Sequence, residues 1–241
     1  GCLVILLIIG GLGWWLQDYV RDAWFSLEQA EGAEAAYEEG NYEVAREKLQ
    51  ALLKKSPDEP ETLRATARLL RGNQPFKAFL AMQRLKEMGE ADPDDLRVFA
   101  QLAQDVRKTH LAEAVTQQLL KQEPKNPDNL FLAARRLFLD FRGVEALVGA
   151  ETILNDWPTH RPTRLLRARL LTLRPELVPR IQGKTELKEL VEEKQDRVSL
   201  EALVILSFSG LRPVLQSERN ATLRQIEFHP LASDGLKLRT F

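Results

Sequence analysis

The chain has 241 residues and carries 34 Lys and Arg against 35 Asp and Glu. This near-balance gives no indication of nucleic-acid binding or of an acidic tail. Leu, Ala, Glu, Lys and Arg dominate and aromatic residues make up only 7% of the chain, which favours helices over sheets. The single cysteine, Cys2, excludes a disulfide within the chain and a thiolate metal cluster.

An uncharged apolar run occupies residues 2–16. As a helix it spans about 22 Å, short of the roughly 30 Å hydrocarbon core of a bilayer. The chain starts at Gly1 rather than at Met, so we expect residues to be missing at both ends, and a few more would complete the span. Aromatic rings of the kind that gather at a membrane–water interface lie at the end of the run, at Trp14 and Trp15, and just after it, at Tyr19. We therefore predict a transmembrane anchor and juxtamembrane helix over residues 1–25.

Two other interpretations of this run fit the sequence less well. A cleaved signal peptide would need small residues after the run, and a core helix is rarely apolar on every face. Residues 17–36 carry one basic residue, Arg21, against five acidic ones. Because cytoplasmic flanks normally have an excess of Lys and Arg, we predict that the bulk of the chain is extracytoplasmic, which means periplasmic in a bacterium.

An internal repeat is the strongest pattern in the chain. Alanine recurs at intervals of 34, 33, 34 and 34 residues, at Ala33, Ala67, Ala100, Ala134 and Ala168. A second alanine follows after twelve residues, or after fourteen in one copy, at Ala45, Ala81, Ala112 and Ala146. Twelve residues further on comes a proline, at Pro57, Pro93, Pro124 and Pro158.

Two antiparallel helices and two short turns use about 34 residues, and small side chains let the two helix axes approach closely. Proline cannot extend the second helix, so the chain turns there. The pattern predicts an all-α chain of stacked helix pairs over residues 26–174, with repeats at about 26–59, 60–92, 93–126 and 127–160 and a partial repeat at 161–174. Pro175, Pro179 and Gly183 interrupt the next second helix. We therefore expect residues 175–210 to be a degenerate helical continuation or cap, and 211–241 to be a loop-rich tail.

The run Glu39-Gly40-Asn41-Tyr42-Glu43-Val44-Ala45-Arg46, with the closing turn Ser56-Pro57, resembles the tetratricopeptide repeat (TPR) family. The likeness covers about residues 26–172, although the family's large first-helix aromatics are replaced by Gln29, Leu63, Leu96 and Leu130. The resemblance implies an α-solenoid whose first helices line a groove that binds partner segments. By the family's geometry the groove residues are Tyr37, Arg64, Arg68, Arg71, Arg97, Gln101, Gln104, Phe131, Arg135, Phe138 and Arg169.

A basic groove with aromatic interruptions would suit an acidic peptide segment or a C-terminal carboxylate. Polar residues opposite a core stripe are, however, also what any solvated helix face presents. The leading hypothesis is a membrane-anchored protein–protein interaction scaffold. Two alternatives stay open: a permanently bound accessory or assembly subunit of a larger membrane complex, and the targeting module of an enzyme whose catalytic domain lies outside this chain.

The sequence contains no Gly-rich phosphate loop, nucleophile elbow or zinc-binding helix motif. His110, His160 and His229 lack metal-type spacing and are predicted to be exposed loop residues. We therefore expect no enzymatic activity, no cofactor, no metal, no nucleic acid and no small-molecule substrate. The expected partners are other proteins.

Overall fold

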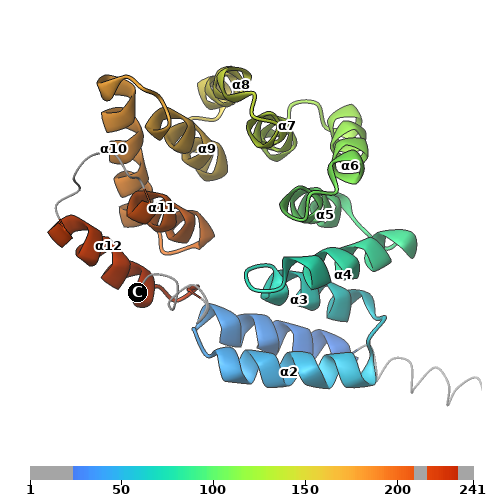
Figure 1. Cartoon of the computed structure of the whole chain (residues 1–241). Helices are drawn as coiled ribbons and strands as arrows, with labels where there is room; N and C mark the ends of the chain where they lie inside the picture. The colour runs from blue at the N-terminus through green and yellow to red at the C-terminus, as the bar shows by residue number, and fades with distance from the viewer. Residues whose placement is uncertain (1–23, 209–215, 233–241) are drawn as a thin grey trace, which may run out of the picture. The chain divides into compact units, whose positions relative to one another are not determined.

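The structure is a computed structural model that describes residues 24–208 and 216–232. These residues form helices joined by short turns, and no strand occurs among them. The predicted all-α architecture of antiparallel helix pairs is thus confirmed for this part of the chain (Figure 1). The chain divides into two compact units, Gly1–Ala91 and Asp92–Phe241.

The first unit contains two helix pairs. A helical segment over residues 24–38 pairs with α2 (Tyr42–Lys55), and α3 (Pro60–Leu70) pairs with α4 (Pro75–Glu87). The side chain of Asn41 caps α2 by accepting a hydrogen bond from the Val44 N–H. Both α3 and α4 begin at a proline, where the missing N–H would have had no helical partner.

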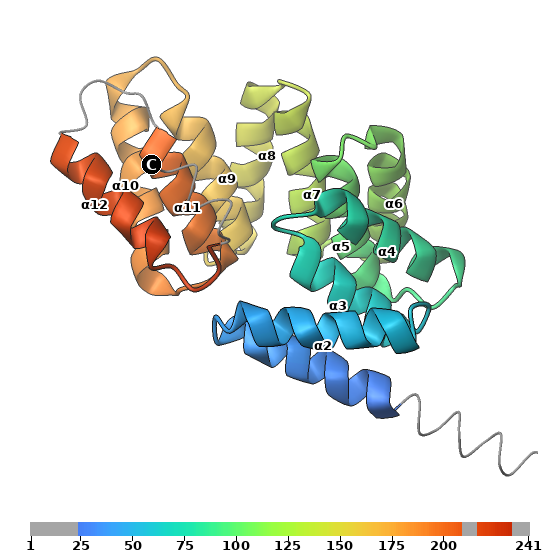
Figure 2. The same ribbon diagram turned by 60° about the horizontal axis from the view of Figure 1, so that its bottom comes forward.

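The second unit continues the alternation with more helices. They are α5 (Pro93–Asp105), α6 (Thr109–Gln122), α7 (Pro127–Leu139), α8 (Gly143–Asp156), α9 (Arg161–Thr172), α10 (Leu177–Glu193), α11 (Arg197–Phe208) and α12 (Gln216–Glu227). Each helix packs on the next, and the first helices also contact one another, α5 with α7, α7 with α9 and α9 with α11. Because the helices of a pair are antiparallel, the α7–α8 and α9–α10 turns lie at the same edge of this unit (Figure 2).

The repeating alanines form the contacts within the pairs. The five first-helix alanines are at most 3% exposed, and the four second-helix alanines at most 7%. In the fourth repeat Ala134 shares one hydrophobic cluster with Ala146 and Ala150 of α8. Small side chains at these positions let the helices approach closely, and fully buried leucines such as Leu119 and Leu132 also belong to the core.

The fifth helix pair is complete, contrary to the sequence-based prediction of a partial repeat at 161–174. Helix α10 runs from Leu177 to Glu193 although it contains Pro179 and Gly183. Pro179 lies in the first turn, where a backbone N–H has no helical acceptor, so its ring is tolerated. Gly183 takes the place of the second alanine: a Cβ atom there would lie 2.5 Å from the carbonyl oxygen of Ala168. Glycine therefore permits a closer contact between α9 and α10 than alanine could.

The segment 211–241, expected to be a loop-rich tail, contains helix α12. Ile226 of α12 and Ala232 are fully buried and cluster with Leu203 of α11. The sequence contains little indication of this helix, because α12 is mostly polar and has few apolar residues at helical spacing. Its packing on α11 makes a sixth helix pair.

No helix within the described ranges is both long enough and apolar enough to cross a bilayer. The predicted anchor at residues 2–16 lies outside the described residues. The same holds for the predicted interface residues Trp14, Trp15 and Tyr19.

Candidate functional site

The predicted groove arginines of the first unit are engaged by partners of the same unit. Arg64 donates to the carboxylate of Glu61 at 2.7 Å and to the backbone carbonyl of Glu90 at 3.0 Å. Arg68 contacts both carboxylate oxygens of Glu34, one repeat earlier, at 2.8 and 2.6 Å. These guanidinium groups tie helices together, and their charge is balanced locally.

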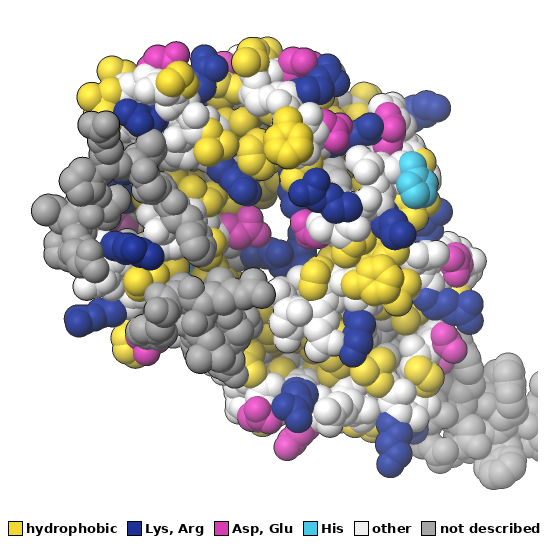
Figure 3. Space-filling view, viewed as in Figure 1, with side chains coloured by type: hydrophobic (Ala, Val, Ile, Leu, Met, Phe, Trp, Pro, Cys, Tyr) yellow, Lys and Arg dark blue, Asp and Glu magenta, His cyan; other side chains and the backbone are white. Residues whose placement is uncertain are grey.

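Tyr37 and Arg71 complete the predicted set of this unit. The ring of Tyr37 lies edge-on to that of Tyr42, with 5.4 Å between the centroids. Arg71 also interacts within the chain. On the face of the molecule in Figure 3, basic and acidic side chains are interspersed and do not gather into one charged patch. Arg64 and Arg68, predicted as groove residues, therefore lie against carboxylates of their own unit.

Arg97 of the second unit has a structural role. Its side chain is only 12% exposed and forms ion pairs with Asp94 and Glu123. Its Nε also donates to Asn129 Oδ1 at 2.9 Å. Asn129 is fully buried, and its amide donates to the backbone carbonyls of Leu119 and Glu123 at the C-terminal end of α6. Arg97 thus links α5, α6 and α7.

Arg135 on α7 reaches back to α5 of the preceding repeat. It donates to Gln104 Oε1 at 2.6 Å and to the carboxylate of Asp105 at 2.5 Å. Gln104 is itself buried and donates to the carbonyl of Leu132 at 2.9 Å. Gln101 likewise interacts within the chain. The predicted site residue Phe131 is 9% exposed and belongs to the hydrophobic core, so it offers little surface to a ligand.

Arg169 on α9 differs from the other predicted arginines. It is solvent-exposed, and its guanidinium lies over the ring of Phe138, 4.7 Å from the centroid. Among the described residues its guanidinium has no hydrogen bond and no ion pair. Loss of hydration beside the surrounding protein lowers the pKa of Arg169, the nearby charge of Arg135 lowers it further, and Glu201 acts in the opposite direction.

The difference between these two arginines follows from the repeat register. Arg135 and Arg169 each come directly after a first-helix alanine. Each contacts the residue that lies four positions after the first-helix alanine of the preceding repeat. For Arg135 that residue is Gln104, whose amide oxygen accepts a hydrogen bond. For Arg169 it is Phe138, whose ring attracts the charge but provides no oxygen acceptor. We name Arg135, Phe138 and Arg169 the Arg169 site.

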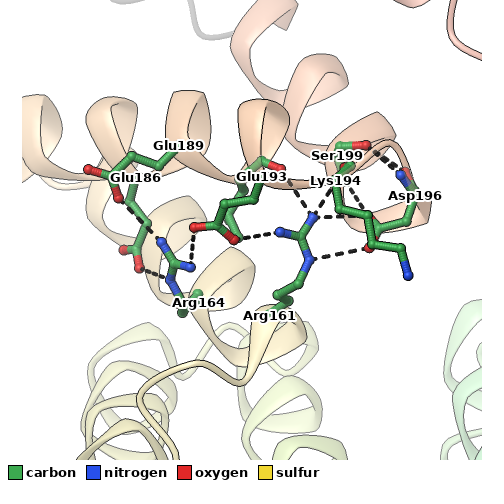
Figure 4. A network of polar contacts seen from close by, with 9 residues as sticks. Arg161, Arg164, Glu186, Glu189, Glu193, Lys194, Asp196 and Ser199 are labelled. Atoms are coloured by element: carbon green, nitrogen blue, oxygen red, sulfur yellow. Dashed lines mark hydrogen bonds and ion pairs between the residues drawn. The ribbon is translucent and has the colours of Figure 1, made fainter.

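A denser set of charges lies between α9, α10 and α11, and the sequence analysis did not identify it (Figure 4). Arg161, the first residue of α9, contacts Glu193 at 2.5 Å and Asp196 at 3.2 and 3.1 Å. It also donates to the backbone carbonyls of Leu190 and Lys194, which end α10. Arg161 therefore joins the C-terminal end of α10 to the start of α11.

Arg164 extends this network one turn further along α9. It contacts Glu186 at 3.3 Å, Glu189 at 3.3 Å and Glu193 at 2.6 Å. The hydrogen bond from Arg164 holds the pKa of Glu193 below its ordinary value, although burial opposes this. The spacing by three residues of Arg161, Arg164 and Arg167, opposite glutamates on the next helix, was the sequence signal for this network. No group of His, Cys, Asp or Glu side chains in the described part of the chain could hold a metal ion.

None of the three histidines is an exposed loop residue as predicted. His110 is exposed but is the second residue of α6. The side chain of His160 is only 13% exposed and contacts Asp128 at 3.1 Å. His229 is 6% exposed. Its Nδ1 accepts a hydrogen bond from the Leu231 N–H at 3.1 Å, and its Nε2 lies 2.9 Å from the hydroxyl oxygen of Ser199. The turn after α12 thus fastens onto the first turn of α11.

The second unit is expected to lose stability as the pH falls below 6.5. Burial lowers the pKa of His229 below its ordinary value of 6.5, and the charge of Asp196 opposes this only in part. Below 6.5 the unfolded chain therefore binds a proton that the folded chain does not, which costs at most about 1.4 kcal/mol per pH unit. Urea titrations at pH 7.5 and 5.5 measure the loss. It should shrink in His229→Gln, which removes the titrating imidazole, and an equal loss in that variant would contradict the assignment.

Comparisons with known proteins do not identify a family for this chain. No protein-family model matches the sequence, and no curated protein matches it. The crystal structure of yeast Tom70 is similar, at 16% identity and a TM-score of 0.49, over 80% of this chain and 41% of that chain. The crystal structure of the P58(IPK) TPR domain is similar at 13% identity and a TM-score of 0.36, over 89% of this chain and 63% of that chain. This chain spans less than two thirds of either protein. Its fold is therefore assigned from its own helix pairs.

Proposed function

We propose that the chain is a membrane-anchored interaction scaffold that binds an acidic segment of a partner protein at the Arg169 site. The observation that carries the proposal is that Arg169 is an exposed residue whose guanidinium has no hydrogen bond or ion pair among the described residues. Its N–H donors are held over the ring of Phe138 and are free to meet a carboxylate. The guanidinium of Arg169 is already partly dehydrated in the free protein. Binding of a ligand therefore has to remove less water from it.

The surroundings of Arg169 favour a short acidic contact over a long one. Arg135 adds a second positive charge nearby, but Gln104 and Asp105 already engage its guanidinium. Glu201 lies within electrostatic reach and would repel a highly charged acidic stretch. We therefore expect one or two carboxylates at the Arg169 site, with an apolar or aromatic neighbour beside Phe138.

A library of random displayed peptides tests this proposal without knowledge of the partner. Panning on the full chain should enrich peptides that carry Asp or Glu. Replacing Arg169 with Gln should weaken the selected peptides by about tenfold or more, since a charge-assisted hydrogen bond contributes about 1.5–3 kcal/mol. Affinity should also fall with added salt, because the contact is exposed.

Arg142→Gln is the matched control, because Arg142 is an exposed arginine of the same unit that pairs with Glu145. It should leave binding of the selected peptides unchanged. Selection of basic or purely apolar peptides, or equal losses in the two variants, would refute the acidic-segment proposal. If the selected peptides are acidic, crosslinking in native membranes followed by mass spectrometry would identify the partner protein.

Membrane anchoring is the second part of the proposal, and it is supported by sequence alone. Residues 2–16 are uncharged and apolar, with Trp14 and Trp15 at the end of the run and Tyr19 just after it as interface residues. The acidic flank after the run favours an extracytoplasmic position for the repeats. Release of the chain from membranes by an alkaline carbonate wash would rule out the anchor.

A further inference from the structure

Helix α10 begins with a patch of exposed aliphatic side chains. Leu177, Val178 and Ile181 are 63%, 65% and 54% exposed. Ile181 lies four residues after Leu177 and three after Val178, and residues at these spacings are neighbours on a helix surface. The three side chains therefore form one continuous apolar patch.

A row of cations borders this patch. Arg180, Lys184 and Lys188 follow one another at intervals of four residues on α10. Arg180 lies three residues after Leu177, and Lys184 three after Ile181, so the row runs along the side of the patch. None of the three cations forms an ion pair with a described residue. We name the three aliphatic residues and the three cations together the α10 face.

The acidic side chains beside the α10 face are already paired. Glu176 pairs with Arg174 at 3.8 Å, and Glu186 is buried against arginines of α9. Glu189 contacts another arginine of α9 at 3.3 Å. Glu192 is exposed but lies beyond the face, towards the end of α10. The α10 face therefore carries an excess of positive charge.

Folding of the helix pair does not require this pattern. The core stripe of α10 is a separate one, in which Leu187 and Leu190 are fully buried against α9 and α11. The connection from Ala168 to Gly183 is three residues longer than the corresponding connection of the fourth repeat, and the patch lies in this longer stretch. Like charges four residues apart lower the stability of a helix, so the basic row costs stability. A second apolar patch bordered by cations indicates a binding surface.

We propose that the α10 face binds the surface of an anionic lipid bilayer. The aliphatic side chains enter the boundary between headgroups and acyl chains, and the three cations contact lipid phosphates. Helices that lie in a membrane surface combine an apolar face with Lys and Arg at its border in this way. The long stems of Lys184 and Lys188 lie along apolar atoms while their ammonium groups stay among the headgroups.

The charges and residue types favour a bilayer over a protein partner. A two-fold contact between copies of this chain uses the same surface twice, so it would bring two unpaired basic rows together. Interfaces between different proteins are enriched in aromatic residues and depleted in lysine, whereas the α10 face has two lysines and no aromatic ring. An anionic bilayer supplies both the negative charge and the apolar layer that complement this face.

A fluorescent probe on α10 tests the proposal in the full chain. In a Cys2→Ser background, Val178→Cys carries an NBD label, since Val178 is exposed and Cys2 is the only native cysteine. The chain is reconstituted into vesicles of phosphatidylcholine and phosphatidylglycerol in equal parts. Emission at position 178 should shift to the blue and be quenched by lipids that carry a doxyl group near the headgroup. The same label at Lys125→Cys, on the exposed α6–α7 turn, should show neither change.

Removal of charge from the basic row should release α10 from the bilayer. Lys184→Gln with Lys188→Gln should lower the bound-to-free ratio of the probe at position 178 by about tenfold or more, because each cation near an anionic surface contributes about fivefold. Lys121→Gln with Lys125→Gln is the matched control, since both are exposed lysines of the same unit, and it should leave the ratio unchanged. Vesicles of phosphatidylcholine alone, or added salt, should also release the probe. An unchanged circular dichroism spectrum shows that the variants are folded.

Three results would overturn the proposal. One is equal quenching at positions 178 and 125. A second is quenching at position 178 that depends neither on the two lysines nor on lipid charge. The third is a blue shift without doxyl quenching that grows with the ratio of protein to lipid, which would assign the α10 face to a second copy of the chain. The anchor is tested by the carbonate wash and the Arg169 site by peptide binding without lipid, so each proposal can fail alone.

Discussion

Gly183→Ala is expected to lower the free energy of unfolding of the second unit by about 2–3 kcal/mol. Helix propensity alone predicts the opposite, because alanine stabilises a helix interior by about 1 kcal/mol relative to glycine. At this position, however, the new methyl group would lie 2.5 Å from the Ala168 carbonyl oxygen and 3.0 Å from side-chain atoms of Leu171 and Thr172. The carbonyl belongs to the α9 backbone and cannot rotate away, so α9 and α10 must separate.

Gly149→Ala is the matched control, since Gly149 is also a glycine inside a second helix. A methyl group there would lie 3.5 Å from Ala134 Cβ, an ordinary van der Waals distance. This variant should be as stable as the parent or more stable by up to about 1 kcal/mol. Urea titration gives the two free energies, and hydrogen exchange of α9 and α10 peptides should show faster exchange in Gly183→Ala only. Equal stability of the two variants would show that α9 and α10 are not in such close contact.

The helix pairs could be predicted because the repeat places small residues at one constant interval. Ala100 and Ala134 are buried for the reason that the spacing gave: each lies where two helices approach. The same logic failed at α10, because the small residue is Gly183 and three extra residues precede it. Pro179 and Gly183 looked like interruptions of a helix. Pro179 is tolerated because it lies in the first turn of α10, and Gly183 because α9 lies very close to it. Neither the start of a helix nor the distance to its neighbour can be seen in a local sequence pattern.

The side chains that form sites were harder to predict than the helices. In sequence Arg97, Arg135 and Arg169 look alike, because each lies near a first-helix alanine. Their roles differ because the side chains that they meet in other helices lie 26 to 32 residues away, as for Arg97 with Glu123 and Asn129. Arg169 could have been distinguished in advance only by comparing the residues that the arginines contact. Arg135 contacts the amide of Gln104, whereas Arg169 contacts the phenyl ring of Phe138. His229 was misjudged for a similar reason, since its partner Ser199 is 30 residues away.

Arg161→Met is expected to lower the free energy of unfolding of the second unit by about 2–3 kcal/mol. Methionine keeps much of the volume, so the loss reports on charge and hydrogen bonds more than on packing. The change removes the Arg161 donor from Glu193, Asp196 and the last carbonyls of α10. Arg164 still donates to Glu193 and the Ser199 N–H still donates to Asp196. The Arg161 side chain is 18% exposed and that of Asp196 is 25% exposed, so water replaces the lost contacts only in part.

The exposed pair Arg142–Glu145 supplies the control, and Arg142→Met should change stability little, because solvent screens it. The pH dependence separates the ionic contribution of Arg161 from packing. Although burial opposes it, the hydrogen bonds from Arg161 and Ser199 lower the pKa of Asp196 below its ordinary 3.8. The stability from this contact is therefore present above pH 3.8 and is lost as the pH falls through the lowered value. The difference between parent and Arg161→Met, measured by urea titration, should narrow over that range. A difference that stays constant would mean that Arg161 acts through the packing of its side chain.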